Sequence, residues 1–132
     1  MSLARILVID DDAVVTRMLS RVLSGHDVIV TESAEDALEL LKSQQFDLIL
    51  CDLAMPGMSG MAFYEAVRAL SAKILEKIVF MTGGAFTTEG HEFLSQLPHS
   101  AWLEKPFDIG ALREMIRVRA ASSDGKANGR AQ

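Results

Sequence analysis

The sequence predicts an α/β fold of the doubly wound type, in which helices cover both faces of one parallel sheet. Five short apolar runs alternate with five segments whose apolar residues recur at helical spacing. The apolar runs show little polar alternation, as expected for strands that are buried on both faces. The chain has 132 residues, of which 49% are hydrophobic, so we expect one domain with a single core.

The first half of the chain predicts two strand-helix units and the start of a third. The first strand, residues 5–9, ends at three aspartates, and the helix after it has an apolar stripe of Val15, Met18, Leu19 and Val22. The second strand covers 27–31, and Ser33 is the expected N-cap of the following helix. The third strand covers about 46–52 and ends in a turn containing Met55, Pro56 and Gly57.

The second half continues the alternation. A helix is expected from about Gly60, with a buried stripe of Phe63, Ala66, Val67 and Leu70. A fourth strand at 77–81, a short helix, a fifth strand at 101–103 and a last helix follow. Right-handed crossovers leave few topologies, and at this length the flavodoxin-like strand order 2-1-3-4-5 is favoured. Residues 120–132 lack apolar anchors and are predicted to form a flexible tail or linker.

Composition excludes several classes of function. The net charge of −5 argues against direct nucleic-acid binding, which depends on neutralising phosphates. No apolar run approaches the roughly 18 residues that a membrane helix needs, and the start lacks a secretory signal. We therefore expect a cytoplasmic protein whose chain makes no membrane contact. Cys51 is interpreted as core filler, and His26, His91 and His99 as ordinary surface residues.

Polar side chains follow four of the predicted strands at their carboxyl ends, where parallel sheets bind ligands. These residues are Asp10 and Asp11, Asp52, Thr82 and Lys105. Asp12 is interpreted instead as a helix cap. Because three carboxylates in one pocket repel each other, a divalent cation is expected there, and the hard oxygen donors favour Mg²⁺.

A carboxylate, a metal ion, an ammonium group and a hydroxyl group around one point could hold a phosphoryl group. Asp52 would then be the nucleophile that forms an aspartyl-phosphate, with Thr82 and Lys105 assisting. A Mg²⁺-dependent phosphohydrolase that uses the same intermediate is the alternative. Haloacid dehalogenase-type enzymes, however, need a second aspartate two residues after the nucleophile, where this chain has Ala54.

In these motifs the chain resembles the receiver domain of two-component response regulators over about residues 4–119. The resemblance rests on the acidic pair at 10–11, the segment D-L-A-M-P-G-M-S-G from Asp52, Thr82-Gly83, and Lys105-Pro106-Phe107. It implies that Asp52 is the phosphoacceptor in a His-to-Asp phosphorelay. It further implies that Asp11, Asp52 and the carbonyl group of Ala54 ligate Mg²⁺, while Asp10 assists through water.

The same resemblance implies a conformational switch and a set of partners. Thr82 and Trp102 would change position on phosphorylation, and the Lys105-Pro106 bond would be cis. The partner would be a histidine kinase or a histidine phosphotransfer domain, and homodimerisation is left open.

Ala54 and Gly84 offer no side chain that could control an attacking water. The chain is expected not to be an enzyme by itself, and the segments 82–86 and 102–107 resemble receivers of hybrid histidine kinases.

Overall fold

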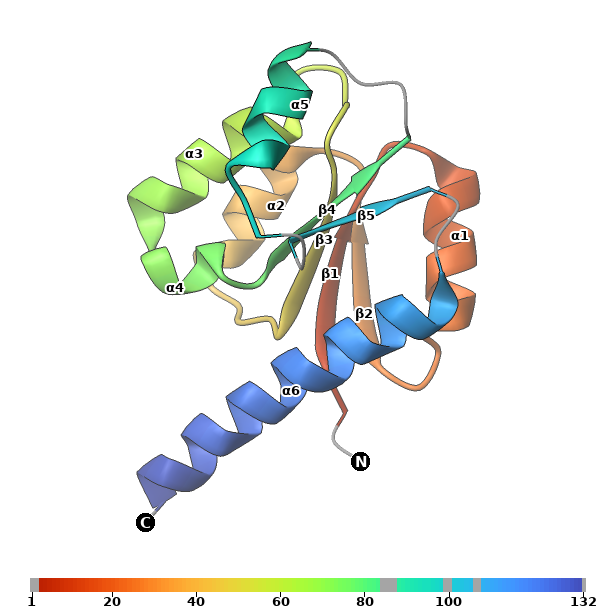
Figure 1. Cartoon of the computed structure of the whole chain (residues 1–132). Coiled ribbons are helices and arrows are strands. Elements are labelled where there is room, and N and C mark those ends of the chain that lie inside the picture. The colour runs from red at the N-terminus through yellow and green to blue at the C-terminus, as the bar shows by residue number, and fades with distance from the viewer. Residues whose placement is uncertain (1–2, 84–87, 99–100, 106–107, 132) are drawn as a thin grey trace.

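The computed structural model describes residues 3–83, 88–98, 101–105 and 108–131, with only the backbone described beyond residue 120. It contains one parallel sheet of five strands, in the order β2-β1-β3-β4-β5 (Figure 1). The strands are β1 (Arg5–Ile9), β2 (Asp27–Thr31), β3 (Leu48–Asp52), β4 (Ile78–Thr82) and β5 (Trp102–Glu104). The predicted fold class and strand order are confirmed, and the first two strands have the predicted bounds.

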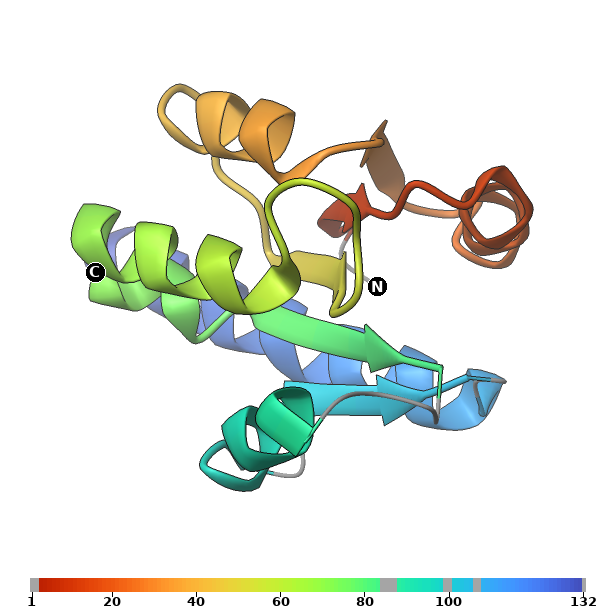
Figure 2. The same ribbon diagram turned by 90° about the horizontal axis from the view of Figure 1, so that it is seen from above.

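Helices cover both faces of the sheet (Figure 2). One face packs against α1 (Ala13–Val22) and α6 (Ile109–Ala131), and the other packs against α2 (Ala34–Leu41), α3 (Gly60–Leu70) and α5 (Thr88–Ser95). All residues of β3 and β4 are buried, since both strands lie inside the sheet. The outer strand β2 is only partly buried. The two central strands therefore carry their terminal side chains on a rigid support.

Local sequence determines where the helices begin. Asp12 caps α1 because its side chain accepts a hydrogen bond from the backbone N–H of Val14, as predicted. Ser33 caps α2 in the same way through the N–H of Asp36, which confirms that assignment. Cys51 lies fully buried in β3, and its thiol donates to the carbonyl oxygen of Asp52.

The structure differs from the predicted helices in three respects. A short helix, α4 (Ala72–Leu75), lies between α3 and β4, where only a connection was expected. Met18, which belongs to the predicted apolar stripe, is 36% exposed, and Leu70, which was predicted to be buried, is 48% exposed. The hydrophobic period alone does not distinguish the centre of a buried face from its flank.

The last helix is longer than expected. The backbone of α6 is helical as far as Ala131 and projects past the sheet (Figure 1), whereas an irregular tail was expected from residue 120. Alanines and arginines in this stretch favour helix, whereas the lack of apolar anchors reports on packing rather than on backbone conformation. That residues 120–132 act as a linker stays a prediction. Among the described residues, none of the helices is long and apolar enough to cross a membrane.

Candidate phosphoacceptor and metal site

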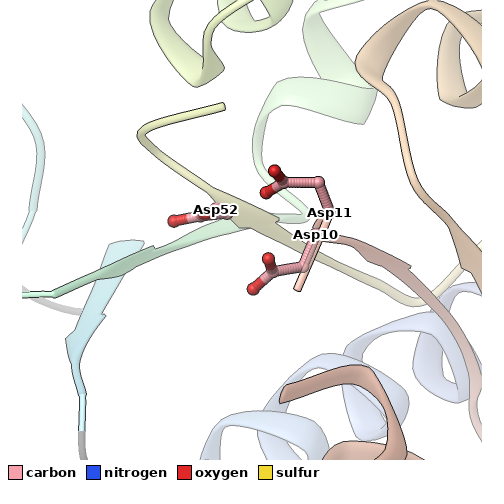
Figure 3. Close-up of side chains that lie close together, drawn as sticks. All are labelled: Asp10, Asp11 and Asp52. Carbon is pink, nitrogen blue, oxygen red and sulfur yellow. The ribbon is translucent and has the colours of Figure 1, made fainter. Parts of the chain in front are cut away.

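Three aspartates meet at the carboxyl edge of the sheet (Figure 3). Asp10 and Asp11 directly follow β1, and Asp52 is the last residue of β3, the strand that pairs with β1. One carboxylate oxygen from each of the three lies within 4.8 Å of the others. The parallel register thus brings together residues that lie about forty positions apart in the sequence, as their places at strand ends predicted.

Lys105 adds a positive charge to this acidic pocket. Its Nζ lies 3.2 Å from Asp10 Oδ2 and 3.6 Å from Asp52 Oδ1. The backbone N–H of Lys105 donates to the carbonyl oxygen of Thr82 at 2.7 Å, which fixes the lysine just past the end of β5. Within the described residues, no other lysine or arginine forms an ion pair with these aspartates.

Asp10 and Asp11 lie in different environments. Asp10 is fully buried, and both of its carboxylate oxygens are engaged, one by Lys105 and the other by the backbone N–H of Asp12 at 2.9 Å. Asp11 is exposed. A buried carboxylate that is already hydrogen-bonded is a poorer direct metal ligand than an exposed one, because a hydrated ion reaches it less easily and part of its acceptor capacity is taken. Asp11 and Asp52 therefore remain the more accessible carboxylates.

The surroundings of Asp52 disfavour the ionised form of its carboxyl group. Burial is the main cause, and it raises the pKa of Asp52 from 3.8 to about 6 together with the nearby charge of Asp10 and, less strongly, of Asp11. The ammonium group of Lys105 and a backbone hydrogen bond from Ala54 act in the opposite direction and lower this pKa. Bringing a further cation into the pocket would relieve the remaining repulsion.

Thr82 ends β4, next to β3, and its side chain is buried. Its hydroxyl oxygen has no hydrogen-bond partner among the described residues. A buried hydroxyl without a partner costs free energy, and this cost would be recovered if the hydroxyl donated to an oxygen brought into the pocket. The space beside Gly83, the next residue, is open, because a Cβ atom added there would touch nothing within 4 Å.

The remaining predicted site residues are less fully described. Trp102 begins β5 opposite Phe80 of β4 and is half-buried. Ala54 is exposed, and its predicted role as a carbonyl ligand stays a prediction. The predictions that concern His99, Gly84 and the Lys105-Pro106 bond lie outside the described residues.

Gly60 supports the site, but the sequence interpretation treated it only as the start of a helix. A Cβ atom at this position would lie 2.9 Å from both the carbonyl oxygen of Asp52 and the Cα atom of Leu53. Its backbone N–H donates to the carbonyl oxygen of Leu53 at 3.0 Å, so the loop after β3 closes tightly over the end of the strand. Glycine is a poor residue within a helix, and that mismatch was the available sequence signal.

Replacing Gly60 by alanine is expected to destabilise the protein by about 1–3 kcal/mol, because backbone atoms on both sides must shift to admit the methyl group. Urea unfolding would measure the change. Gly25→Ala is the matched control, since nothing lies within 4 Å of a Cβ atom there. Equal unfolding midpoints for the two variants would contradict the close approach at Gly60.

The donor set in the pocket fits Mg²⁺. The cluster offers three carboxylate oxygens, which are hard ligands, and the described residues place no cysteine or histidine among them. Magnesium prefers one or two carboxylates and completes its octahedron with water. Asp11 and Asp52, with the carbonyl group of Ala54 as predicted, would hold the ion.

A doubly wound sheet that gathers acidic residues, a lysine and a threonine at its carboxyl edge defines a class of α/β proteins with one binding site at that edge. Within this class, the chain belongs to the response regulator receiver domain family, whose sequence model matches residues 6–117. Receiver domains are the phosphoacceptors of two-component systems; they typically bind Mg²⁺ at an acidic pocket and interact with histidine kinases or phosphotransfer domains.

Relatives and solved structures agree with this assignment. The chain is 30% identical over 119 residues to the response regulator protein FleR of Pseudomonas aeruginosa, covering 89% of this chain and 24% of FleR. It is 29% identical over 122 residues to the sensory/regulatory protein RpfC of Xanthomonas campestris, covering 90% of this chain and 17% of RpfC. A response regulator receiver protein from Pseudomonas putida superposes with a TM-score of 0.73 at 28% identity, covering 89% and 98% of the two chains. The chain thus spans a quarter or less of these two curated relatives.

Proposed function

We propose that Asp52 accepts a phosphoryl group from a phosphohistidine on a partner protein, in a reaction that requires Mg²⁺. The observation that carries this proposal is the convergence of Asp10, Asp11 and Asp52 with the ammonium group of Lys105 3.6 Å from Asp52. An oxygen of Asp52 attacks the phosphorus atom, and the bond from phosphorus to the histidine nitrogen breaks. The electron pair of that bond stays on the leaving imidazole, and Asp52 becomes an acyl phosphate.

Each neighbouring group has a defined part in this proposal. Bound Mg²⁺ supplies positive charge that stabilises the phosphoryl oxygens during transfer. Lys105 turns from Asp52 to a phosphoryl oxygen, and its contact with Asp10 keeps it in the pocket. The unpartnered hydroxyl of Thr82 donates to a second phosphoryl oxygen.

The movement of Thr82 toward the phosphoryl group links the site to a protein-interaction surface. In our proposal Trp102 then turns inward, which changes the face made by α5, β5 and α6. The half-buried position of Trp102, which pairs with Phe80 two residues before Thr82 on β4, supports this coupling. The unit that performs this function would span residues 4–119.

The wider setting is also a proposal. The likeness to RpfC, a sensory/regulatory protein several times longer than this chain, supports a parent protein of the hybrid histidine kinase type. In that setting the receiver acts in the cytoplasm as a substrate of the kinase or of a phosphotransfer domain. It would neither bind nucleic acid directly nor turn over other substrates as a separate chain.

The central test uses acetyl phosphate and Mg²⁺ with the intact chain. Mass spectrometry is expected to show an adduct of about 80 Da on the wild type and none on Asp52→Asn. Asp36→Asn is the matched control, since Asp36 lies exposed in the first turn of α2 and should leave the adduct in place. No adduct on the wild type at saturating donor, or an adduct on Asp52→Asn, would overturn the proposal.

The same samples test the switch and the alternative enzyme function. Trp102 is the single tryptophan, so its fluorescence should change when beryllofluoride and Mg²⁺ bind and should not change in Asp52→Asn. Unchanged fluorescence with binding confirmed by calorimetry would exclude the switch while leaving phosphorylation intact. Repeated turnover of unrelated phosphate esters would favour the phosphohydrolase.

A further inference from the structure

A groove at the amino edge of the sheet gathers three of the five lysines in the chain. It has a volume of about 420 Å³ and lies between the α2-β3 connection and the α3-α4-β4 connection. Its lysines are Lys42, Lys73 and Lys77, and we call it the lysine groove. Since β3 and β4 begin beside it and end at the acidic pocket, the groove and the phosphoacceptor lie at opposite edges of the sheet.

The charge of the lysine groove is opposite to that of the whole protein. The chain has a net charge of −5, yet no aspartate or glutamate lies among the groove's lining residues. Lys42 pairs with Glu39 at 3.0 Å, but both side chains are more than half exposed, so the pair is weak and easily exchanged. A local excess of positive charge favours an anionic partner.

Hydrogen bonds hold the walls of the lysine groove in place. The backbone N–H of Ile49 donates to the carbonyl oxygen of Lys77 at 2.9 Å, which joins the two walls at the floor. Behind the other wall, the Arg5 guanidinium donates to the carbonyl oxygen of Gln45 and to Gln44 Oε1, and lies over the ring of Phe46. A groove with walls fixed in this way needs little reorganisation to bind a ligand.

The lining of the groove contains both apolar and polar side chains. Phe46 and Ile49 lie buried behind the groove, and the half-buried Ile74 is an apolar lining side chain that stays partly accessible. Ser71 lies at the rim and, although it precedes α4, its hydroxyl makes no capping hydrogen bond. Free phosphate would leave the apolar part unused. Nucleic acid would find no stacking surface, because Phe46 is only 3% exposed.

We propose that the lysine groove binds an acidic peptide segment of a partner protein, one in which glutamates or aspartates flank a leucine-like side chain. The carboxylates pair with Lys42, Lys73 and Lys77, and the apolar side chain packs against the half-buried Ile74. This inference does not depend on the proposed phosphoryl transfer, because none of the groove residues belongs to the acidic pocket. It gives the domain a second protein-binding surface, on the edge remote from Asp52.

Fluorescence anisotropy with the full chain tests the proposal. A short fluorescein-labelled peptide of Glu-Glu-Leu repeats is expected to bind, and its affinity should fall when salt is raised from about 50 mM to about 300 mM. The double variant Lys73→Gln/Lys77→Gln should lower the affinity by roughly tenfold or more. Arg17→Gln is the matched control: it removes one exposed positive charge from α1, on the other face of the sheet, and should leave binding unchanged.

Comparison peptides separate the outcomes. A Gln-Gln-Leu peptide should bind at least roughly tenfold more weakly, because it lacks the carboxylates that pair with the lysines. A peptide of glutamate alone should also lose affinity, because it leaves Ile74 uncovered. The proposal is overturned if the double variant binds the acidic peptide as well as the wild type does while circular dichroism shows that it is folded. It is also overturned if the wild type binds an oligothymidylate of equal charge more tightly than it binds the peptide.

Discussion

Replacing Lys105 by methionine is expected to destabilise the metal-free protein by about 2–4 kcal/mol at neutral pH. The lysine contacts Asp10 and Asp52, and Asp10 is fully buried. Removing the ammonium group leaves two neighbouring carboxylates without their cation, and a buried uncompensated charge costs several kcal/mol. The partial exposure of Lys105, at 23% of its side chain, places the expected loss below the upper end of that range.

Urea unfolding in EDTA at pH 7.5 measures this loss, and repeating it in Mg²⁺ should restore part of the stability, because the ion replaces the missing charge. Lys42→Met makes the same chemical change at an exposed pair and should cost no more than about 1 kcal/mol. Adding Asp52→Asn to Lys105→Met should recover stability. If the two lysine variants unfold at the same urea concentration, the pocket does not depend on Lys105 as described.

Replacing Asp52 by asparagine is expected to stabilise the metal-free protein by about 2 kcal/mol at pH 7.5, with about 3 kcal/mol as the ceiling set by linkage. Burial and the charge of Asp10 raise the pKa of Asp52 to about 6 in the fold. The folded state therefore binds this proton more tightly than the unfolded state does. The resulting stability is present at low pH and is lost as the pH rises through about 6, so the wild type is penalised at neutral pH and the variant is not.

The pH dependence distinguishes this cause from a general packing effect. The gain from Asp52→Asn should be complete above about pH 7 and should disappear as the pH falls toward 4, where the wild type is protonated. Asp36→Asn removes a carboxylate from the first turn of α2, where the helix dipole favours it, and should be slightly destabilising at neutral pH. A gain from Asp52→Asn that persisted unchanged at pH 4 would show that ionisation is not its source.

The convergence of the three aspartates could be predicted because topology alone brings them together. Once the strands are parallel and ordered 2-1-3-4-5, the residues that follow β1 and β3 must meet, and these are Asp10, Asp11 and Asp52. The bounds of β1 and β2 were predictable because each apolar run is bordered by charged residues. The roles assigned to Thr82, Lys105 and Trp102 stay predictions until phosphorylation is measured.

Other features could not be predicted, because they depend on tertiary contacts that the pattern of residues along the sequence does not specify. The tight approach of Gly60, the first residue of α3, to the end of β3 arises from the closure of the preceding loop, and a glycine at the start of a helix does not by itself indicate such a contact. The lysine groove combines Lys42, which follows α2, with Lys73 of α4 and Lys77, which precedes β4, and these positions follow no motif. The exposure of Met18 and Leu70 depends on how far each helix is rotated about its axis, which a hydrophobic stripe defines only approximately.

The environment of Cys51 has a practical consequence for studying movement in this domain. Burial raises the pKa of its thiol, and the thiol donates to the backbone beside Asp52 in the centre of the sheet. It is the single cysteine of the chain. Maleimide dyes react with accessible thiolates, so cysteines introduced on α5 or α6 can be labelled in the native protein while Cys51 stays unmodified. Spectroscopic probes can thus be attached in pairs without first altering the strand that carries Asp52.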